Sequence, residues 1–264
     1  MPRPTQAFID LSALAHNLGV VRQYVPCSRI MAVVKADAYG HGLLHTASAL
    51  KDVDGFALLE LDAAISLRDA GYQQPILLLE GFFSIEELAL FEQYRLSAVI
   101  HHSEQIAMLS DSRHHNLDLF LKINTGMNRL GLAPEQFPQI MKALTDHPGI
   151  DSITLMTHFA SADDPLEEDE VFQQLQYFEA ITQNHKYPHS LANSAAIIRY
   201  PVTHADWVRP GIMLYGASPF ADKTASELNL KPVMTLSSKI IAIHDLKIGD
   251  RVGYHGLFHA DHPM

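Results

Sequence analysis

Positively charged side chains follow several of the short apolar runs in this 264-residue sequence. The cations at or just beyond the ends of such runs are Lys35, Lys122, Arg129 and Arg209. Each alone is typical of a solvated loop residue. The whole chain, however, has a formal charge of −11. Four cations at successive strand ends in such an acidic chain predict a site that binds an anion.

The spacing around Lys122 indicates which way that side chain points. Leucine or isoleucine occupies every second position from 117 to 123, so these residues share one face of a strand. Asp118, Phe120, Lys122 and Asn124 then share the other face. If the first face packs on helices, the second points into the interior of a barrel, where a lysine must be paired or used chemically.

Two polar loops indicate that the anion is a phosphate. Asn193 and Ser194 form a polar cap before a helical stretch, and Arg209 is followed by a proline, Gly211 and Ile212. Barrels often bind phosphate in the loops after their seventh and eighth strands, on N–H groups at a helix terminus. Either loop alone is common turn chemistry. Their joint position favours a ligand site.

The elements that carry these residues alternate along the chain. Short apolar runs that predict strands lie at 30–34, 56–59, 76–79, 98–100, 117–123, 153–156, 190–191 and 207–208. Between them, segments such as 60–70, 85–94, 135–145 and 169–181 have helical spacing. Repeated strand and helix imply parallel pairing. About eight units predict a closed (β/α)₈ TIM-type barrel. An open doubly wound sheet fits less well, because no strand is followed by a Gly-x-Gly-x-x-Gly turn.

The pattern changes after Pro219. We expect a barrel domain over 1–219, then a linker and the first strands of an incomplete β-domain over 220–264. The segments 232–243 and 251–254, joined by a turn at 247–250, predict two antiparallel strands. Two strands alone bury too little surface to form a domain.

Composition excludes several classes of protein. The negative charge argues against a nucleic-acid or anionic-membrane surface, and no apolar run is long enough to span a membrane. The N-terminus is a poor export signal, and the single cysteine, Cys27, fits a reducing compartment. We therefore expect a soluble cytoplasmic protein. The sixteen histidines, including adjacent pairs at 101–102 and 114–115, lack metal-ligand spacing, so we expect no metal.

Motifs along nearly the whole chain resemble those of alanine racemases. The segment 33–42 (Val-Val-Lys-Ala-Asp-Ala-Tyr-Gly-His-Gly) is similar to the pyridoxal-phosphate attachment signature of that family. The segments 122–131, 157–160, 193–195, 209–216 and 252–254 follow in the family's order and spacing. The resemblance implies a pyridoxal 5'-phosphate (PLP) enzyme, an isomerase that interconverts L-alanine and D-alanine for peptidoglycan synthesis or alanine catabolism.

The resemblance also implies roles at the cofactor's phosphate and aldehyde. Lys35 would form the Schiff base with the aldehyde. That step needs a neutral amine, which nearby positive charge favours. Tyr39, Ser194 and the backbone N–H groups of Gly211 and Ile212 would hold the phosphate.

Around the pyridine ring and the substrate, the resemblance implies a further set of roles. His158 would lie against the ring and Arg209 would face its nitrogen, donating a hydrogen bond without leaving a proton there. Asn193 also counts among the cofactor-binding residues. Arg129 would orient the substrate carboxylate, and Lys122 matches a position that is carbamylated in many relatives.

Racemisation needs a base on each face of the α-carbon. The resemblance assigns Lys35 to the face that handles D-alanine and Tyr254 to the face that handles L-alanine. In the family this tyrosine reaches the other subunit, so a homodimer is implied. Relatives continue well beyond Tyr254, which leaves open a non-catalytic barrel that binds the cofactor, or an unstable fragment. A related barrel decarboxylase or aldolase is disfavoured by the arginine at the pyridine position.

Overall fold

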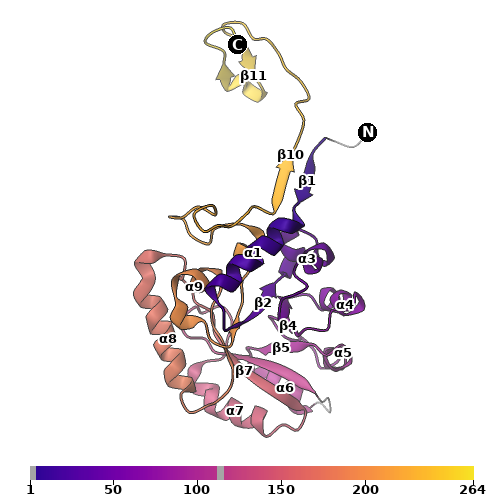
Figure 1. The fold of residues 1–264 in the computed structure, drawn as a ribbon, viewed down its shortest axis with the longest axis vertical. Helices are drawn as coiled ribbons and strands as arrows, with labels where there is room; N and C mark the ends of the chain where they lie inside the picture. The colour runs from indigo at the N-terminus through magenta and orange to yellow at the C-terminus, as the bar shows by residue number, and fades with distance from the viewer. Residues whose placement is uncertain (1–3, 112–115) are drawn as a thin grey trace. The chain divides into compact units, whose positions relative to one another are not determined.

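Residues 4–111 and 116–264, which the computed structural model describes, contain eight parallel strands that close into a barrel (Figure 1). In barrel order they are β2 Arg29–Val33, β3 Gly55–Leu58, β4 Ile76–Leu78, β5 Ser97–Ile100, β6 Leu117–Lys122, β7 Ile150–Met156, β8 His189–Ser190 and β9 Trp207–Val208. Arg29 and Ile30 of β2 pair with Trp207 and Val208 of β9, which closes the ring. The predicted barrel is confirmed, and the open sheet is excluded.

Helices follow the strands around the barrel, and Figure 1 shows α3, α4 and α5 in chain order along one side. The α-helices are α1 Leu11–Tyr24, α2 Lys35–Gly40, α3 Leu43–Ala49, α4 Leu61–Asp69, α5 Glu87–Gln93, α6 Ser103–Asp111, α7 Phe137–Thr145, α8 Glu168–Thr182 and α9 Ser194–Arg199. Short 3₁₀ turns are η1 Pro134–Gln136, η2 Pro165–Glu167, η3 Pro201–Thr203, η4 Ile212–Tyr215 and η5 Tyr254–Gly256. None of the helices in the described part of the chain has the length and apolar character that a bilayer crossing needs.

Apolar spacing decides how each helix packs. In α7 the buried residues are Phe137, Ile140, Met141 and Leu144, which is the stripe that a helix lays on a sheet. The odd-numbered residues of β6 belong with such helix residues in one buried cluster. Phe120 instead belongs to a second cluster inside the barrel, with Met31, Val99 and Met156 among others. The predicted division of the 117–123 strand into an outer and an inner face is confirmed.

The chain divides into two compact units, Ile9–Met234 and a smaller one that comprises the described residues up to Phe8 and Thr235–Met264. In the first unit, the segment before Met234 is fastened to α1 by Asn17. Its fully buried amide donates to the carbonyls of Leu214 (2.9 Å) and Lys231 (2.8 Å) and accepts from the N–H of Lys231 (2.8 Å). One buried side chain thus replaces the hydrogen bonds that a strand partner would provide.

Gly216, directly after η4, is closely surrounded. Its φ is +82°, and a Cβ there would lie 1.8 Å from the carbonyl oxygen of Lys231. We expect Gly216→Ala to lower the free energy of unfolding by at least ~3 kcal/mol, because backbone atoms cannot give way cheaply. Gly71→Ala is the control: its φ is +92°, but nothing lies within 4 Å, so it should cost about 1 kcal/mol. Urea unfolding measures both, and equal losses would contradict the crowding.

The smaller unit is built from short strands. β1 (Gln6–Ile9) pairs with β10 (Met234–Ser237), and β11 (Arg251–Val252) pairs antiparallel with β12 (Phe258–His259). Each of the two segments predicted as strands, 232–243 and 251–254, therefore contains a strand, but the expectation that the two pair with each other across the 247–250 turn is wrong. The strand in the first segment, β10, pairs with β1 from the other end of the chain. The second turns back through η5 onto its own continuation.

Candidate active site

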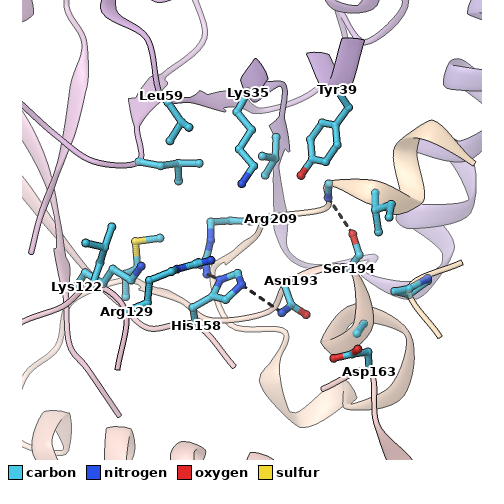
Figure 2. A pocket seen from close by; sticks show the side chains of 18 of the residues that line it. Lys35, Tyr39, Leu59, Lys122, Arg129, His158, Asp163, Asn193, Ser194 and Arg209 are labelled. Carbon is cyan, nitrogen blue, oxygen red and sulfur yellow. Dashed lines mark hydrogen bonds between the residues drawn. The ribbon is translucent and has the colours of Figure 1, made fainter. Parts of the chain in front are cut away.

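A cavity of about 540 Å³ opens at the carboxyl ends of the barrel strands. The sequence-predicted residues that line it are Lys35, Tyr39, Lys122, Arg129, His158, Asn193, Ser194, Arg209, Gly211 and Ile212. Figure 2 shows the Lys35 amine and the Tyr39 hydroxyl pointing into the same space as Arg209 and His158. The topology of a closed barrel brings these residues together, because every strand ends at the same rim.

The chain enters this cavity through a strained turn. Lys35, two residues after β2, begins the segment labelled α2, but this segment is not a right-handed helix. The four residues from Ala36 to Tyr39 all have φ between 51° and 55°, a left-handed turn without glycine. Such a conformation costs roughly 1–2 kcal/mol per residue and persists only where surroundings impose it. Ala38 is fully buried, and the Asp37 carboxylate accepts the N–H of Leu43 at 2.7 Å. This left-handed turn brings the side chains of Lys35 and Tyr39 into the same cavity.

The ring of Tyr39 packs against a second tyrosine, Tyr215. Its ring centroid lies 4.7 Å from that of Tyr215, whose hydroxyl donates to the carbonyl of Val33 at 3.0 Å. Burial raises the pKa of the Tyr39 hydroxyl, so this group remains a neutral donor. Across from it, a Cβ on Gly211 would lie 2.7 Å from the Tyr39 oxygen. Only a glycine permits this close approach of backbone and hydroxyl.

Ser194 completes this corner of the cavity. Its Oγ accepts the N–H groups of Gly211 (2.9 Å) and Met213 (3.4 Å), joining the loop after β8 to the loop after β9. Asn193 begins α9 as its N-cap, accepting the N–H of Ala196 at 3.1 Å. Hydroxyls and backbone N–H groups therefore converge at one end of the cavity, as a phosphate requires.

Arg209, which is only 4% exposed, also lines the cavity. Its guanidinium donates to Ser190 Oγ (2.6 Å) and to the carbonyls of Thr157 (2.7 Å) and Leu191 (3.1 Å). Burial lowers the pKa of Arg209 to about 10, which still leaves it protonated at neutral pH. The arginine is thus a fixed donor. It lies 3.3 Å from Nδ1 of His158.

His158 is held neutral by its surroundings. Burial comes first and the charge of Arg209 second among the causes that put the pKa of its imidazole well below the ordinary value of 6.5. Because Arg209 can only donate, Nδ1 of the neutral ring accepts, and the ring proton belongs on Nε2. The Nδ2 group of Asn193, which is also a donor, lies 3.4 Å from that nitrogen, so the two do not form a hydrogen bond in this tautomer. A flat, uncharged ring is suited to packing against an aromatic ligand.

Lys122 is the most perturbed amine of the site. It is only 6% exposed. Burial first, and then the charges of Arg209 and Arg129, lower its pKa to about 8 from the ordinary 10.5, while Glu80 acts in the opposite direction. About a tenth of this amine is therefore neutral at pH 7, far more than for a lysine with the ordinary pKa.

Two acidic residues that sequence reasoning missed, Glu80 and Asp163, also line the cavity. Glu80 lies just beyond β4, at the same kind of strand end as the predicted cations, but a carboxylate there gave no signal for an anion site. Its carbonyl accepts from Gln105 Nε2 and from His101, each at 3.0 Å, which pins the loop after β4. Of the histidines set aside, His114 and His115 lie outside the described residues.

Tyr254 belongs to the smaller unit and is 95% exposed. Of the predicted site residues that the structure describes, it alone lies outside the cavity lining, whose described members all come from the barrel unit. Its role stays a prediction.

Comparison with known proteins places this geometry in a family. The family model described as "Alanine racemase, N-terminal domain" matches residues 9–219. The alanine racemase of Nitrosospira multiformis is 58% identical over 265 residues, and that of Nitrosomonas europaea is 61% identical over 267. Each comparison spans 100% of this chain and 74% of the relative.

Solved structures of alanine racemases have the same fold as this chain. The biosynthetic alanine racemase from Pseudomonas aeruginosa superposes with a TM-score of 0.94 at 41% identity, over 99% of this chain and 74% of the other. The alanine racemase from Acinetobacter baumannii gives 0.92 at 40% identity, over 100% and 74%. The barrel, its motifs and these relatives together show that the chain belongs to the alanine racemase family of enzymes.

Proposed function

We propose that the barrel cavity binds pyridoxal 5'-phosphate and uses it to interconvert L-alanine and D-alanine. One observation carries the proposal: the amine of Lys35, the Ser194–Gly211 corner and the buried Arg209 line a single cavity, although they follow three different strands. That is the set of contacts that an aldehyde, a phosphate and a pyridine nitrogen of one flat molecule would require.

The residues present fit this cofactor on independent grounds. Four cations line the cavity, Lys35, Lys122, Arg129 and Arg209, against the two carboxylates of Glu80 and Asp163. The excess of positive charge suits a phosphate together with a substrate carboxylate. Gly211 donates its N–H to Ser194 Oγ, and a Cβ on it would lie 2.7 Å from the Tyr39 hydroxyl, so the close approach of the two depends on the absence of a side chain at 211.

Each residue then has a definite task. Tyr39, Ser194, Asn193 and the N–H groups of Gly211 and Ile212 would bind the phosphate end. Lys35 would attach the aldehyde end through its Nζ. When bound, the cofactor supplies an electron-accepting ring that acidifies the substrate's α-hydrogen. Arg209 would donate to the ring nitrogen, which limits this effect and disfavours side reactions, while neutral His158 would pack against the ring.

Two bases are required because the proton leaves one face of the α-carbon and returns on the other. Lys35 would take or return the proton on the face that handles D-alanine, and Tyr254 on the face that handles L-alanine. Arg129 would hold the substrate carboxylate. Tyr254 would come from a second copy of the chain, which makes the active unit a homodimer.

Lys122 would carry a carbamate. Carbon dioxide adds only to a neutral amine, and a pKa of about 8 supplies one. The product would replace a cation by an anion among Arg129, Arg209 and Lys35, and so relieve the repulsion that lowers the amine's pKa. We expect intact mass spectrometry of gently handled protein to show the added mass of one carbon dioxide. Lys122→Met should lack it, and an unmodified mass in bicarbonate buffer would contradict the assignment.

The free Lys122 amine also makes stability depend on pH. With a pKa of about 8 when folded against 10.5 when unfolded, the unfolded chain binds more protons between these values, so the free energy of unfolding rises with pH there. Lys122→Met has no amine to titrate, so it should not share this rise. As the pH is raised from about 8 to 10.5, its free energy of unfolding should therefore fall behind that of the unchanged chain by up to about 3 kcal/mol. Urea unfolding of bicarbonate-free protein measures it, and a difference that is constant with pH would contradict the pKa.

A non-catalytic barrel that binds the cofactor is the second candidate. It would need only the residues that line the barrel cavity, all of which belong to the barrel unit, and would make no use of Tyr254. Incubating cofactor-loaded protein with L-alanine and detecting D-alanine with a D-amino-acid oxidase distinguishes the two. A sizing column run in parallel shows whether activity accompanies the dimer. Bound cofactor without D-alanine would favour the second candidate.

A further inference from the structure

A second cavity, of about 550 Å³, lies at the opposite end of the barrel. Residues at the amino-terminal ends of the strands line it, among them Arg29 where β2 begins and Trp207 where β9 begins. Of the cluster inside the barrel, Val33 and Met156 line the first cavity, whereas Phe120 and Trp207 line the second. The packed interior therefore separates the two cavities.

One wall of this cavity carries a positive charge. The guanidinium carbon of Arg29 lies 4.1 Å from the centre of the Trp207 ring. Within the described residues this guanidinium makes no ion pair. The contact with the ring positions the guanidinium, and its N–H groups donate to no acceptor within the described residues, so they are available to a carboxylate.

The facing wall is negative. Asp118 of β6 and Asp151 of β7 both line the cavity, and Asp118 accepts a hydrogen bond from the Ser152 hydroxyl. In the ring of eight strands, β6 is the fourth from β2 in either direction, so Asp118 stands diametrically opposite Arg29. Opposite charges on opposite walls do not neutralise each other by direct contact.

Polar groups also line the cavity beside Asp118, on β5 and β7, the two strands that flank β6. Ser97 and Thr154 are 2% and 5% exposed and line the cavity. Their hydroxyls make no hydrogen bond within the described residues. Buried hydroxyls of this kind need a partner from water or a ligand.

We propose that this cavity binds a small zwitterion of about dipeptide size, with its carboxylate at Arg29 and its ammonium group at Asp118 and Asp151. A neutral molecule would leave both walls unpaired, and an ion of one sign would leave one of them unpaired. A single α-amino acid has both charged groups attached to one carbon atom, whereas this cavity presents its complementary charges across the barrel. Its volume lies in the range of small-molecule sites. The site is separate from the proposed racemase cavity.

Trp207 provides the test, because it is the only tryptophan in the chain and lines this cavity. The probe is glycylglycine, which has no chiral centre to racemise, titrated into cofactor-loaded protein while tryptophan fluorescence is followed. We expect a saturable change. N-acetylglycylglycine, without the ammonium group, and glycylglycinamide, without the carboxylate, should each bind at least about tenfold more weakly.

Variants assign the two ends. Arg29→Gln should weaken the binding of glycylglycine at least about tenfold, and this variant should bind glycylglycine and glycylglycinamide equally. Asp118→Asn should also weaken the binding of glycylglycine at least about tenfold, and it should bind glycylglycine and N-acetylglycylglycine equally. Arg22→Gln, at another exposed arginine, is the matched control and should change neither. Calorimetry measures the variants, and unchanged cofactor absorbance shows that their barrels are intact. No fluorescence change, or equal binding of all three probes to the unchanged protein, would overturn the proposal.

Discussion

Lys35→Ala is expected to abolish both the visible absorbance of bound cofactor and the formation of D-alanine, with the rate falling by at least about 10⁴-fold. The side chain is the one amine that the left-handed turn aims beside Tyr39 and across from Arg209 (Figure 2). Its removal takes away the attachment point and one of the two proposed bases together. Absorbance spectra and the oxidase-coupled assay measure the two effects.

Lys51→Ala is the matched control for that substitution, since Lys51 is an exposed lysine of the same unit outside the cavity lining. It should leave both readouts unchanged. If Lys35→Ala keeps the cofactor spectrum, another lysine holds the cofactor, and the assignment built on the turn after β2 is wrong.

Tyr254→Phe is expected to leave cofactor absorbance unchanged and to lower racemisation by about 10²- to 10⁴-fold, the range that a positioned proton-transfer group contributes. A side chain that is 95% exposed supports neither the barrel nor the cofactor corner within its own chain. A loss of rate at constant absorbance therefore reports a chemical role.

Tyr177→Phe, at an exposed tyrosine of α8, is the control for loss of a surface hydroxyl and should keep full activity. Equal activity of Tyr254→Phe and the unchanged chain would contradict the two-base proposal and leave a single base at Lys35.

The barrel and most of the site could be predicted from sequence because the signals are local. Alternate apolar positions from 117 to 123 determine which face of β6 meets the helices, and that alone directs Lys122 inward. Since all strand ends of a closed barrel meet at one rim, cations that follow separate strands had to come together there. The convergence of Lys35, Ser194 and Arg209 follows from this topology.

What could not be predicted depends on contacts distant in sequence. The residues from Ala36 to Tyr39 have φ values that favour glycine, yet none is glycine, so the sequence does not predict the turn. Its conformation is held instead by the burial of Ala38 and by the packing of Tyr39 on Tyr215. The pairing of β1 with β10 joins segments from the two ends of the chain, so no local turn signals it. The site at Arg29 was not predicted, because it lies at the amino-terminal ends of the strands, whereas the chemistry of barrels is expected at the carboxyl ends.

The measurement that tests the central claim most directly is chemical trapping of the cofactor. Borohydride reduction of the loaded protein makes the link between cofactor and lysine permanent, and peptide mass spectrometry then identifies the labelled residue. The account predicts the label on Lys35, with Lys122 unlabelled. A label on Lys122, or none on any lysine of the cavity, would contradict it.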